Sequence, residues 1–507
     1  MLAKLQGNAQ EVIGQRQPPP IPHSTRPRPT KPAGSRPFVV LRNSQLYLDD
    51  GTPFRFAALN APELLYGDVF EAEDTMRSLA GFGRRATRTY TLKIKGTSPH
   101  FGDAGHINGW DSQKGDWIYD EGQFVKMDHV LALAEKYDVR LIIPIIGQDF
   151  GSANDNWYGN WVDMIIYRKN PSWDYQTAKK KIDFFNDREC IDSYKTLLNY
   201  LLNRINTVTG KRYGDDPSIL AWQTGNELQH SYKGARPPPG HWTAEIASHI
   251  KSLAPHTLVM DGSFAKDDRI EECYAREALK SKDVDIIDYH YYGTGDATRV
   301  TKEAAFAKKH GKAFVAAEYG FFGDINDYAM FLRAAEQSGA SGSLIWSLRP
   351  HSAKGGFKTH REDENNSAYH VPGWPNPLVS QSRTKPSNWD EKEYRIIEYI
   401  RHASFSINRE PVPEHFPVPV APHLWSNGNG SVSWRGAAWA ISYEIWLAPN
   451  SNAGQEPQWQ NVGRGITDAV EEGKCAFYLP PHSQGTVMVR GFSVDGAAGE
   501  WSNAVQV

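Results

Sequence analysis

The chain has 507 residues, more than one ordinary hydrophobic core accommodates, which predicts at least two domains. An apolar content of 40% with 23% charged residues is typical of a globular protein. The formal net charge of −3 provides no electrostatic footprint for nucleic acid or an anionic membrane, and we expect neither as a partner. The 16 Trp and 23 Tyr residues supply rings that build cores and also stack on flat apolar ligand faces, including sugars.

The chain carries no sequence signal for a membrane span or a disulfide framework. No apolar run reaches the roughly 18 residues that a span requires. The N-terminal segment also lacks the unbroken apolar stretch of a secretory signal, which predicts an intracellular protein unless the N-terminus is altered. Cys190, Cys273 and Cys475 are too widely spaced for a metal-ligand pattern, and we expect them to be small buried side chains.

The N-terminal segment is rich in Pro, Arg, Gln and Ser, so it buries too little apolar surface to offset the entropy cost of ordering. We therefore expect residues 1–36 to be disordered. The alternating apolar residues of 38–56, with an Asp-Gly pair at 50–51, then predict a short β-hairpin.

From residue 37 to residue 408, short apolar strands alternate with longer amphipathic segments. The expected strands cover residues 54–60, 85–90, 140–146, 219–226, 257–262, 284–290, 313–319 and 342–348. Segments between them, such as 125–137 and 193–208, have apolar residues at helical spacing. Repeated β-then-α units predict an α/β fold of the (β/α)8 TIM-barrel type with long loops. A doubly wound open sheet is the alternative, but no Gly-rich phosphate fingerprint follows the first strand.

The C-terminal part of the chain changes in character. A Pro-rich segment at 409–420 predicts a semi-rigid linker. Residues 421–507 form short alternating strands separated by turn signals, which predict a small all-β sandwich. Trp434, the SYEIW segment at 442–446 and the ending at 487–505 resemble a fibronectin type III domain, an immunoglobulin-like fold.

The active site of a (β/α)8 barrel lies at the carboxyl ends of its strands, so residues there are the first candidates for chemistry. The expected strands deliver to these ends Arg88, Asn226, Glu227, His290, Tyr292, Glu318 and Trp346. Buried glutamates are rare unless they are paired or functional, so this set predicts a site rather than part of the core.

Each of these residues also has a structural explanation. Glu227 could cap the following helix, Arg88 could be an ion-pair partner, and Trp346 could belong to the core. A metal site formed by His290 and the carboxylates is conceivable, but no HExxH or similar spacing accompanies it. We expect no metal and no cofactor.

The two glutamates taken together fit glycoside hydrolysis. Retaining glycosidases place two carboxyl groups about 5–5.5 Å apart, one as nucleophile and one as acid/base. Strands four and seven lie across the barrel mouth, so Glu227 and Glu318 can face each other over a sugar ring. A nearby Arg keeps a nucleophilic carboxylate ionised, and an Asn beside the acid can bind the sugar 2-hydroxyl.

The run LLNRINTVTGKRYGDDPSILAWQTGNEL (201–228) resembles glycoside hydrolase family 5, in particular its β-mannanase and β-mannosidase branch. The segment NDNWYGNWVDMIIY (154–167) is similar to the Trp-rich insertion of mannanases. The segments IIDYHYYG, FVAAEYGF and LIWSLRPHSAKGGFKTHRED are similar to the last three strands of the family and the loop that follows. The resemblance covers about residues 38–405.

The resemblance implies a retaining β-glycosidase that acts on the β-1,4-mannosidic linkages of mannan or manno-oligosaccharides. Glu227 would be the acid/base and Glu318 the nucleophile. The substrate-binding residues that it implies are Arg88, Asn226, His290, Tyr292 and Trp346, with Trp157 and Trp161 stacking on sugar rings. We expect a monomer. Members of the family are mostly extracellular, in contrast to the missing signal.

Departures from the family leave the substrate open. The usual Asn-Glu-Pro-Arg is replaced by Asn226-Glu227-Leu228-Gln229, the next loop is Pro-rich, and an insertion occupies 359–375. These differences bear on the sugar chain that fits and on endo or exo cleavage, and Leu228 and Gln229 are expected to matter most. A family 5 β-1,4-glucanase and a catalytically inactive carbohydrate-binding protein are the alternatives.

Overall fold

The structure is a computed structural model, and it describes most of the chain beyond the N-terminal segment. The described residues are 36–96, 104–230, 236–265, 269–292, 299–362, 365–366, 368–373, 391–450, 456–468, 472–473 and 477–507. The prediction of disorder for residues 1–36 falls almost entirely outside this part of the chain. Cys475 and several residues of the 359–375 insertion also lie outside it.

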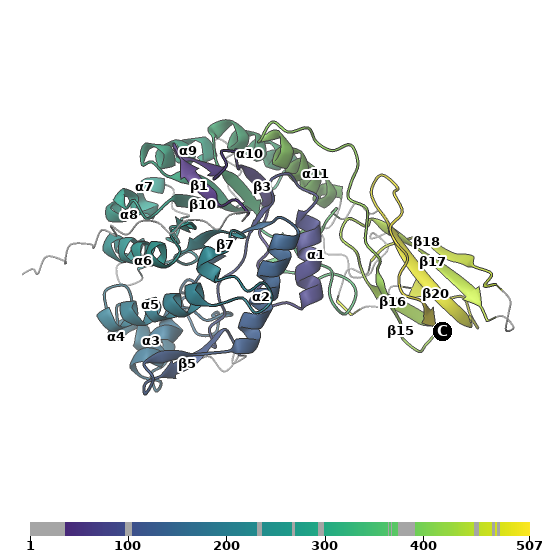
Figure 1. The fold of residues 1–507 in the computed structure, drawn as a ribbon, viewed down its shortest axis with the longest axis horizontal. Coiled ribbons are helices and arrows are strands. Elements are labelled where there is room, and N and C mark those ends of the chain that lie inside the picture. Colours follow the sequence, from purple (N-terminus) through teal and green to yellow (C-terminus); the bar gives the residue numbers. More distant parts are fainter. Residues whose placement is uncertain are drawn as a thin grey trace, which may run out of the picture.

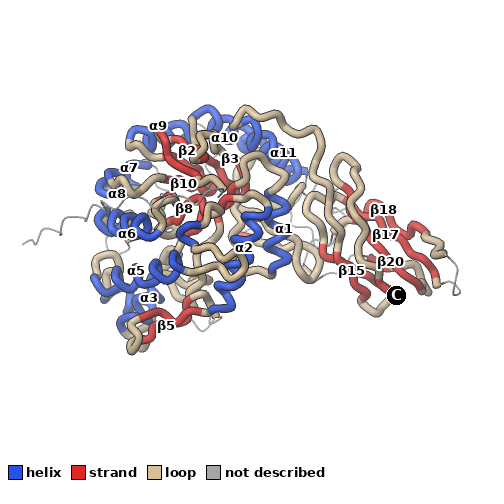
Figure 2. Tube along the Cα trace, in the orientation of Figure 1, coloured by secondary structure: helices blue, strands red, loops and turns tan. Residues whose placement is uncertain are grey.

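Eight parallel strands form the predicted barrel, in the spatial order β3-β12-β11-β10-β9-β8-β7-β4 (Figures 1 and 2). Each falls on one of the eight expected segments. Their bounds are β3 Phe56–Leu59, β4 Ala86–Arg88, β7 Arg140–Pro144, β8 Ile219–Gln223, β9 Leu258–Met260, β10 Ile286–Tyr292, β11 Ala313–Gly320 and β12 Gly342–Ile345. The barrel closes between β3 and β4, where Ala61 N donates to Arg88 O at 2.9 Å and Thr87 Oγ1 donates to Leu59 O at 2.7 Å.

The strands are almost wholly buried because their two faces meet different apolar layers, as is usual for parallel sheets. One cluster fills the barrel and includes Phe56, Ile142, Met260 and Val315. A larger cluster lies between the strands and the surrounding helices.

Helices follow the strands and surround the barrel (Figure 1). Local sequence sets their ends: Asp68 and Glu71 form a capping box on α1, and Asp187 caps α5. The bounds are α1 Val69–Leu79, α2 Glu121–Lys136, α3 Trp161–Lys169, α4 Tyr175–Lys181, α5 Arg188–Asn203, the 3₁₀ turn η1 Tyr213–Asp215, α6 Gly240–Leu253, α7 Ile270–Cys273, α8 Arg276–Lys280, α9 Arg299–Lys309, α10 Ile325–Ser338 and α11 Glu391–Ser406.

The predicted N-terminal hairpin is present, and another hairpin turn precedes the expected one. Strands β1 (Val39–Arg42) and β2 (Gln45–Leu48) pair around Asn43 and Ser44, both of which have positive φ, as a tight two-residue hairpin turn requires. The Asp-Gly pair at 50–51 forms the expected turn after β2, where Leu48 N donates to Thr52 O at 2.8 Å and Tyr47 forms an antiparallel bridge with Pro53. Val39 and Leu46 join the cluster inside the barrel, so the hairpin covers the barrel end opposite the carboxyl ends of the strands.

Two smaller hairpins lie in loops of the barrel part of the chain. Strands β5 (Ile107–Asp111) and β6 (Asp116–Tyr119) form an excursion between β4 and α2 that the sequence did not predict. Strands β13 (Arg361–Glu362) and β14 (Asn365–Asn366) pair within the insertion after β12.

The C-terminal β domain consists of two antiparallel sheets, in agreement with the predicted all-β region. One has the order β15-β16-β19 and the other β18-β17-β20-β21. Residues of both sheets, including Val432, Trp434, Ile445 and Val489, share one apolar cluster. The bounds are β15 His423–Ser426, β16 Ser431–Arg435, β17 Ser442–Pro449, β18 Gln460–Ile466, β19 Phe477–Tyr478, β20 Gly485–Phe492 and β21 Val505–Gln506. The fibronectin type III resemblance stays a prediction.

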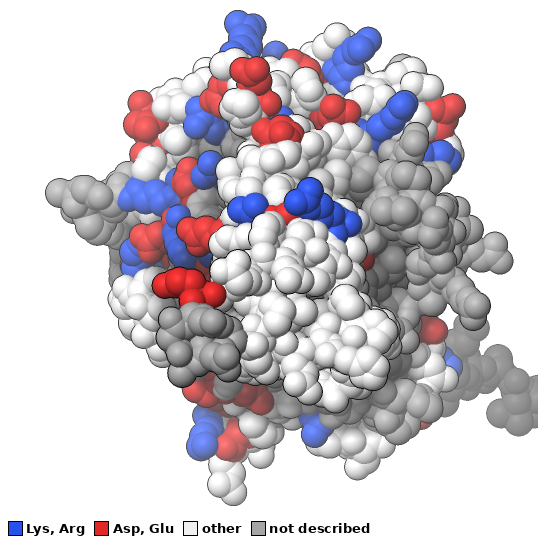
Figure 3. Space-filling view, turned by 90° about the vertical axis from the view of Figure 1, so that its right-hand side faces the viewer, with Lys and Arg blue, Asp and Glu red and all other residues white. Residues whose placement is uncertain are grey.

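The predicted linker, 409–420, is packed against the barrel. Arg401 of α11 donates Nη2 to the carbonyls of Pro413 and His415, each at 3.0 Å, and its guanidinium lies 4.5 Å from the Phe416 ring. Figure 3, which faces the end of the molecule that carries the C-terminal β domain, shows a broad area with few charged side chains. Within the described residues, no helix has the length and apolar character needed to cross a membrane.

Candidate active site

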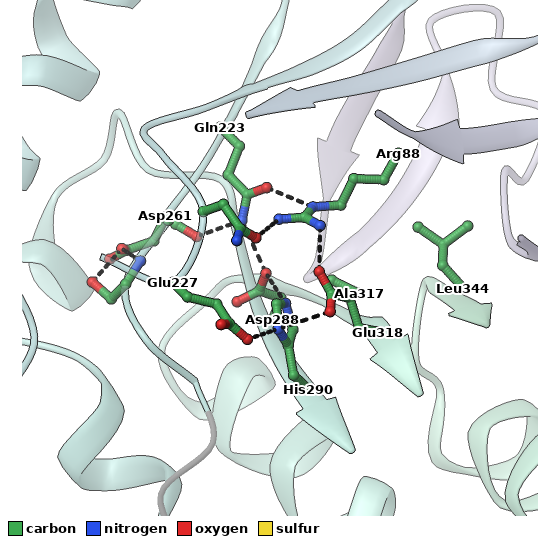
Figure 4. A network of polar contacts seen from close by, with 12 residues as sticks. Arg88, Gln223, Glu227, Asp261, Asp288, His290, Ala317, Glu318 and Leu344 are labelled. Atoms are coloured by element: carbon green, nitrogen blue, oxygen red, sulfur yellow. Dashed lines mark hydrogen bonds and ion pairs between the residues drawn. The ribbon is translucent and has the colours of Figure 1, made fainter. Parts of the chain in front are cut away.

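Glu318 lies near the end of β11 and is held by several donors (Figure 4). Arg88 Nη1 donates to its Oε1 at 2.7 Å, and the Tyr292 hydroxyl donates to its Oε2. Arg88 is fully buried, and its other nitrogens donate to Gln223 Oε1 at 2.8 Å and to Asn226 Oδ1. The guanidinium thus fixes one carboxylate oxygen of Glu318 and the strand end that carries the second glutamate.

Glu227 follows β8 in a backbone conformation that is rare for its residue type. Its φ of 48° places it in the left-handed region, which costs free energy for any residue with a side chain. Its Oε1 lies 2.6 Å from His290 Nδ1, and its Oε2 accepts from Gln148 Nε2 at 2.9 Å. Gln148 also accepts from Asn226 Nδ2, so Asn226 and Glu227 are held by one side chain.

The two glutamates face each other across a short gap. Side-chain oxygens of Glu227 and Glu318 and a ring nitrogen of His290 all lie within 4.8 Å of one another. Both glutamates are nearly buried, with exposed fractions of 5% and 4%. This spacing is close to the 5–5.5 Å of retaining glycosidases and well below the 6.5–9.5 Å that inverting enzymes need for a water.

His290 carries positive charge between the carboxylates. Burial by itself would lower the pKa of His290, but the negative charges of Glu318, Asp288 and Glu227 raise it to about 9. Near neutral pH the Glu227–His290 pair therefore holds a proton at its 2.6 Å contact, beside the gap between the glutamates.

A second layer of buried polar residues contacts the side chains that surround the two glutamates. Gln223 Nε2 donates to Asp288 Oδ2 at 3.0 Å, and Tyr274 donates its hydroxyl to Asp288 Oδ1 at 2.8 Å. Asp261 is fully buried on the neighbouring strand, and burial raises its pKa to about 6. The second layer links β8, β9 and β10 beneath the catalytic candidates.

Two aromatic side chains border the gap. Trp346, just after β12, is 8% exposed and its ring lies edge-on to Tyr90 at 6.1 Å between centroids. Burial and the charges of Glu227 and Glu318 raise the pKa of Tyr90 well above its usual value, so it stays a neutral hydroxyl at 3.3 Å from Gln148 Oε1. Trp346 thus follows the carboxyl end of β12 and contacts a ring that is close to both glutamates, while its role in sugar binding stays a prediction.

The two candidate stacking tryptophans differ in their surroundings. Trp157 is 58% exposed and presents its ring to solvent. Trp161 begins α3 and is fully buried, with Phe184 and Phe185 at 5.8 and 5.4 Å between ring centroids. Trp161 belongs to the core between helices and is not available to stack on a sugar, which corrects the prediction for this residue.

Leu228 also differs from expectation. It is fully buried and packs on Gly225, where an added Cβ would lie 2.6 Å from Leu228 Cδ1. Leu228 therefore supports the strand end from inside and does not line a cleft. Gln229 remains a candidate for a substrate contact, and the Pro-rich loop after it lies partly outside the described residues.

The Glu227–His290–Glu318 triangle is compact enough to be considered as a metal site. Its donor atoms are already paired, since His290 Nδ1 contacts Glu227 and the Arg88 cation contacts Glu318 at 2.7 Å. A guanidinium and a protonated imidazole repel a divalent cation at this position. The site therefore suits acid/base and nucleophilic chemistry better than metal binding.

Sequence reasoning missed the residues that support the named ones. Gln148 comes two residues after the predicted 140–146 strand, so the rule that active-site residues follow barrel strands could have found it. Asp288 lies two residues before His290 on the same face of β10, and Gln223 ends β8. None of them belongs to a catalytic motif that a sequence search would single out.

A (β/α)8 barrel with two buried carboxylates at the ends of its fourth and seventh strands has the architecture of a glycoside hydrolase. Comparison with known proteins agrees. The family profile described as "GH family 5 beta-mannosidase-like" matches residues 109–319, which include Glu227 and all of the β7–β10 region. Over these residues the chain is therefore similar to the β-mannosidase-like members of glycoside hydrolase family 5.

Individual relatives are distant. Putative mannan endo-1,4-beta-mannosidase 5 of Oryza sativa subsp. japonica is 29% identical over 239 residues, 45% of this chain and 43% of its own. Mannan endo-1,4-beta-mannosidase 8 of the same plant is 33% identical over 146 residues, 28% of this chain and 36% of its own. The chain thus spans less than half the length of these two curated relatives.

Solved structures show the same fold. The glycoside hydrolase family 5 mannosidase from Rhizomucor miehei superposes with a TM-score of 0.53 at 19% identity, over 73% of this chain and 98% of its own. The endo-1,4-beta-mannanase from the same fungus gives a TM-score of 0.51 at 21% identity, over 61% of this chain and 90% of its own.

Proposed function

We propose that this protein is a retaining β-glycoside hydrolase that cleaves β-1,4-mannosidic linkages. The observation that carries the proposal is the pairing of Glu227 and Glu318, whose oxygens lie within 4.8 Å at the mouth of the barrel. This distance fits direct attack by one carboxylate on the sugar better than attack by a water held between them. The family profile and the mannanase names of the relatives support mannan as the substrate class.

In the first step, Glu318 attacks the anomeric carbon while Glu227 donates a proton to the leaving oxygen. Arg88 and Tyr292 hold the attacking carboxylate in a fixed orientation, so its loss of hydration is offset by preorganised donors. The bond from Glu318 to the sugar forms as the glycosidic bond breaks, and the proton leaves Glu227 with the departing hydroxyl.

In the second step, a water replaces the leaving group. Glu227, now ionised, removes a proton from this water, which attacks the anomeric carbon and releases Glu318. His290 and Gln148 each contact one oxygen of Glu227, so they stabilise its charged form between the two steps. Asn226 lies beside Glu227, in position to bind the sugar 2-hydroxyl once substrate displaces its contact with Gln148.

A substrate panel tests this proposal. Galactomannan, mannohexaose, cellohexaose and carboxymethylcellulose are incubated with the protein and the products are separated by chromatography. We expect hydrolysis of the manno-substrates, and single mannose units throughout would indicate exo action whereas mixed oligomers would indicate endo action. Hydrolysis of the gluco-substrates alone would replace mannan by glucan as the substrate, and no hydrolysis of any β-glycoside would overturn the proposal.

A further inference from the structure

The C-terminal β domain is joined to the barrel through a buried network centred on His351. This residue lies in the loop after β12, a short distance along the chain from Trp346, and is 1% exposed. Its main-chain N and its Nδ1 lie 2.9 and 3.0 Å from Asp74 Oδ2, on helix α1 of the barrel. Its Nε2 lies 3.2 Å from Asp468 Oδ2, which belongs to the C-terminal β domain. One side chain thus bridges two carboxylates from two domains.

Each carboxylate of this bridge also accepts a hydrogen bond from the β domain. Ala438 N donates to Asp74 Oδ1 at 3.0 Å, and Trp434 Nε1 donates to Asp468 Oδ1 at 3.0 Å. Both carboxylates are nearly buried. Since buried charges are costly unless they are paired, the network specifies one docking geometry and not a range of them.

Close steric contacts enforce the same geometry. An added Cβ at Gly436 would lie 2.1 Å from His351 Cδ2, so only glycine allows the β domain to approach the imidazole. Trp439 packs on Gly81 of the barrel, where an added Cβ would lie 2.0 Å from its ring, and Trp439 Nε1 donates to Arg77 O at 3.1 Å. In Figure 1 the β domain lies on the side of the barrel that carries α1, in agreement with these contacts.

The β domain also holds the loop beyond His351. Arg435 Nε donates to Ala353 O at 2.8 Å, and Gly473 N donates to Gly355 O at 3.0 Å. Lys358 pairs with Glu472 at 3.1 Å. The segment 351–358 is therefore fixed from the side of the C-terminal β domain.

The other end of the same loop borders the candidate active site. Leu348 N donates to Asn60 O at 2.7 Å, and Arg349 Nη1 pairs with Glu63 at 2.6 Å. Main-chain bonds also tie Ser347 and Arg349 to Tyr369. Trp346 is thus connected to the domain interface by a short stretch of chain whose main-chain groups form hydrogen bonds at Ser347, Leu348 and Arg349.

We propose that His351 is a positioning residue, through which the C-terminal β domain fixes the 346–358 loop and with it the Trp346 side of the sugar-binding site. The C-terminal β domain is then part of the catalytic unit rather than an independently moving appendage. The inference rests on the proposed function for its effect on activity, but the positioning of the loop can be measured separately.

The charges around His351 give this bridge a pH dependence. It faces Asp74 of α1 and Asp468 of the β domain, with Glu71 on α1, Lys358 in the loop and the Tyr443 hydroxyl nearby. Burial alone would lower the pKa of His351, but Asp74 and Asp468 raise it to about 10. A raised pKa means that the stabilisation is complete below the usual imidazole pKa and is lost as the pH rises toward 10.

The test uses three variants of the full chain. His351→Gln removes the charge, and the isosteric Asp468→Asn weakens the bridge from the β-domain side only. Lys354→Gln is the matched control, because Lys354 pairs with Glu472 across the same interface but its side chain is 76% exposed. Measured on mannohexaose where each variant is folded, kcat/KM should fall about tenfold in the first two, mostly through KM, and stay unchanged in the control.

Amide hydrogen exchange is the readout that does not depend on activity. In His351→Gln and Asp468→Asn, exchange of residues 344–351 should speed up about tenfold or more, while β8 and β11 keep their protection. Unchanged exchange in this segment, or reduced thermal stability with unchanged kcat/KM, would overturn the positioning role. If the wild-type protein hydrolyses no β-glycoside, the proposed function fails while the exchange result still decides the positioning of the loop.

Discussion

Replacing Arg88 by Met removes the guanidinium that donates to Glu318, while keeping an unbranched side chain of similar length. Arg88 has no exposed surface and donates to Gln223, Glu318 and Asn226. The variant leaves Glu318 and the strand end of Asn226 without these donors, next to a second buried carboxylate.

The structure sets the expected size of the effect. Removing one partner of a buried ion pair costs about 3–5 kcal/mol of the free energy of unfolding, which leaves a typical domain folded but less stable. The charge-assisted bonds to the two active-site acceptors are each worth about 1.5–3 kcal/mol, so their loss predicts a fall in kcat/KM of about 10²- to 10⁴-fold. Arg88→Lys keeps the positive charge but lacks the planar guanidinium with its several donors. Its kcat/KM should therefore lie between those of Arg88→Met and the wild type.

The assay measures kcat/KM on mannohexaose and the free energy of unfolding in denaturant, at a temperature at which the variant is folded. Arg140→Met is the matched control, because Arg140 is 2% exposed, begins β7 and lies at the opposite end of the barrel. It should lose stability but keep its kcat/KM. An Arg88→Met variant that is folded and retains wild-type kcat/KM would refute the assigned role of Arg88 beside Glu318.

Other variants give further expected results. Trp157→Ala should raise KM several-fold for long substrates and leave the thermal midpoint unchanged, because the Trp157 ring is 58% exposed, whereas Trp161→Ala should cost about 3–5 kcal/mol of stability because Trp161 is fully buried. Steady-state kinetics and denaturant melts of both variants check this contrast, and the reverse pattern would contradict it. The alkaline limb of kcat/KM should lie near pH 9, where the Glu227–His290 pair loses its shared proton, and a pH–rate profile of His290→Gln should shift that limb. If the alkaline limb of kcat/KM lies at the same pH in His290→Gln as in the wild type, His290 does not cause it. Glu227→Gln should lose activity on mannan but keep formation of the glycosyl-enzyme from substrates with good leaving groups, as stopped-flow bursts would show.

The sequence predicted the barrel well because its parallel strands are buried on both faces. Such strands appear as short uninterrupted apolar runs, and FVAAEY and ILAWQ are clear examples. The same periodicity placed Glu227 and Glu318 at strand ends, where the structure has them.

The errors arose where sequence alone does not report which way a side chain points. Trp161 and Trp157 lie in one Trp-rich segment, but the capping box of Asn160 and Asp163 starts a helix that turns Trp161 into the core. The Asp-Gly pair predicted the turn at 50–51, but the preceding turn at Asn43–Ser44 was missed, because it is made by two residues with side chains that take positive φ.

Contacts between distant segments also had no sequence signal. Gln148 contacts Asn226 and Glu227, which lie 78 and 79 residues further along the chain. His351 contacts Asp74 and Asp468, which lie 277 and 117 residues away. A polar residue in a loop has many possible partners, so only the folded chain shows which one it finds. The relation between the barrel and the C-terminal β domain followed from the structure for this reason.

Trapping of the covalent intermediate tests the central claim most directly. A 2-deoxy-2-fluoro-β-mannosyl fluoride slows both steps but carries a good leaving group, so a retaining enzyme accumulates the glycosyl-enzyme, which intact mass spectrometry detects. We expect one sugar per chain, located on Glu318 by peptide mapping and absent in Glu318→Gln. An active enzyme that forms no adduct, or an adduct on a residue other than Glu318, would contradict the account.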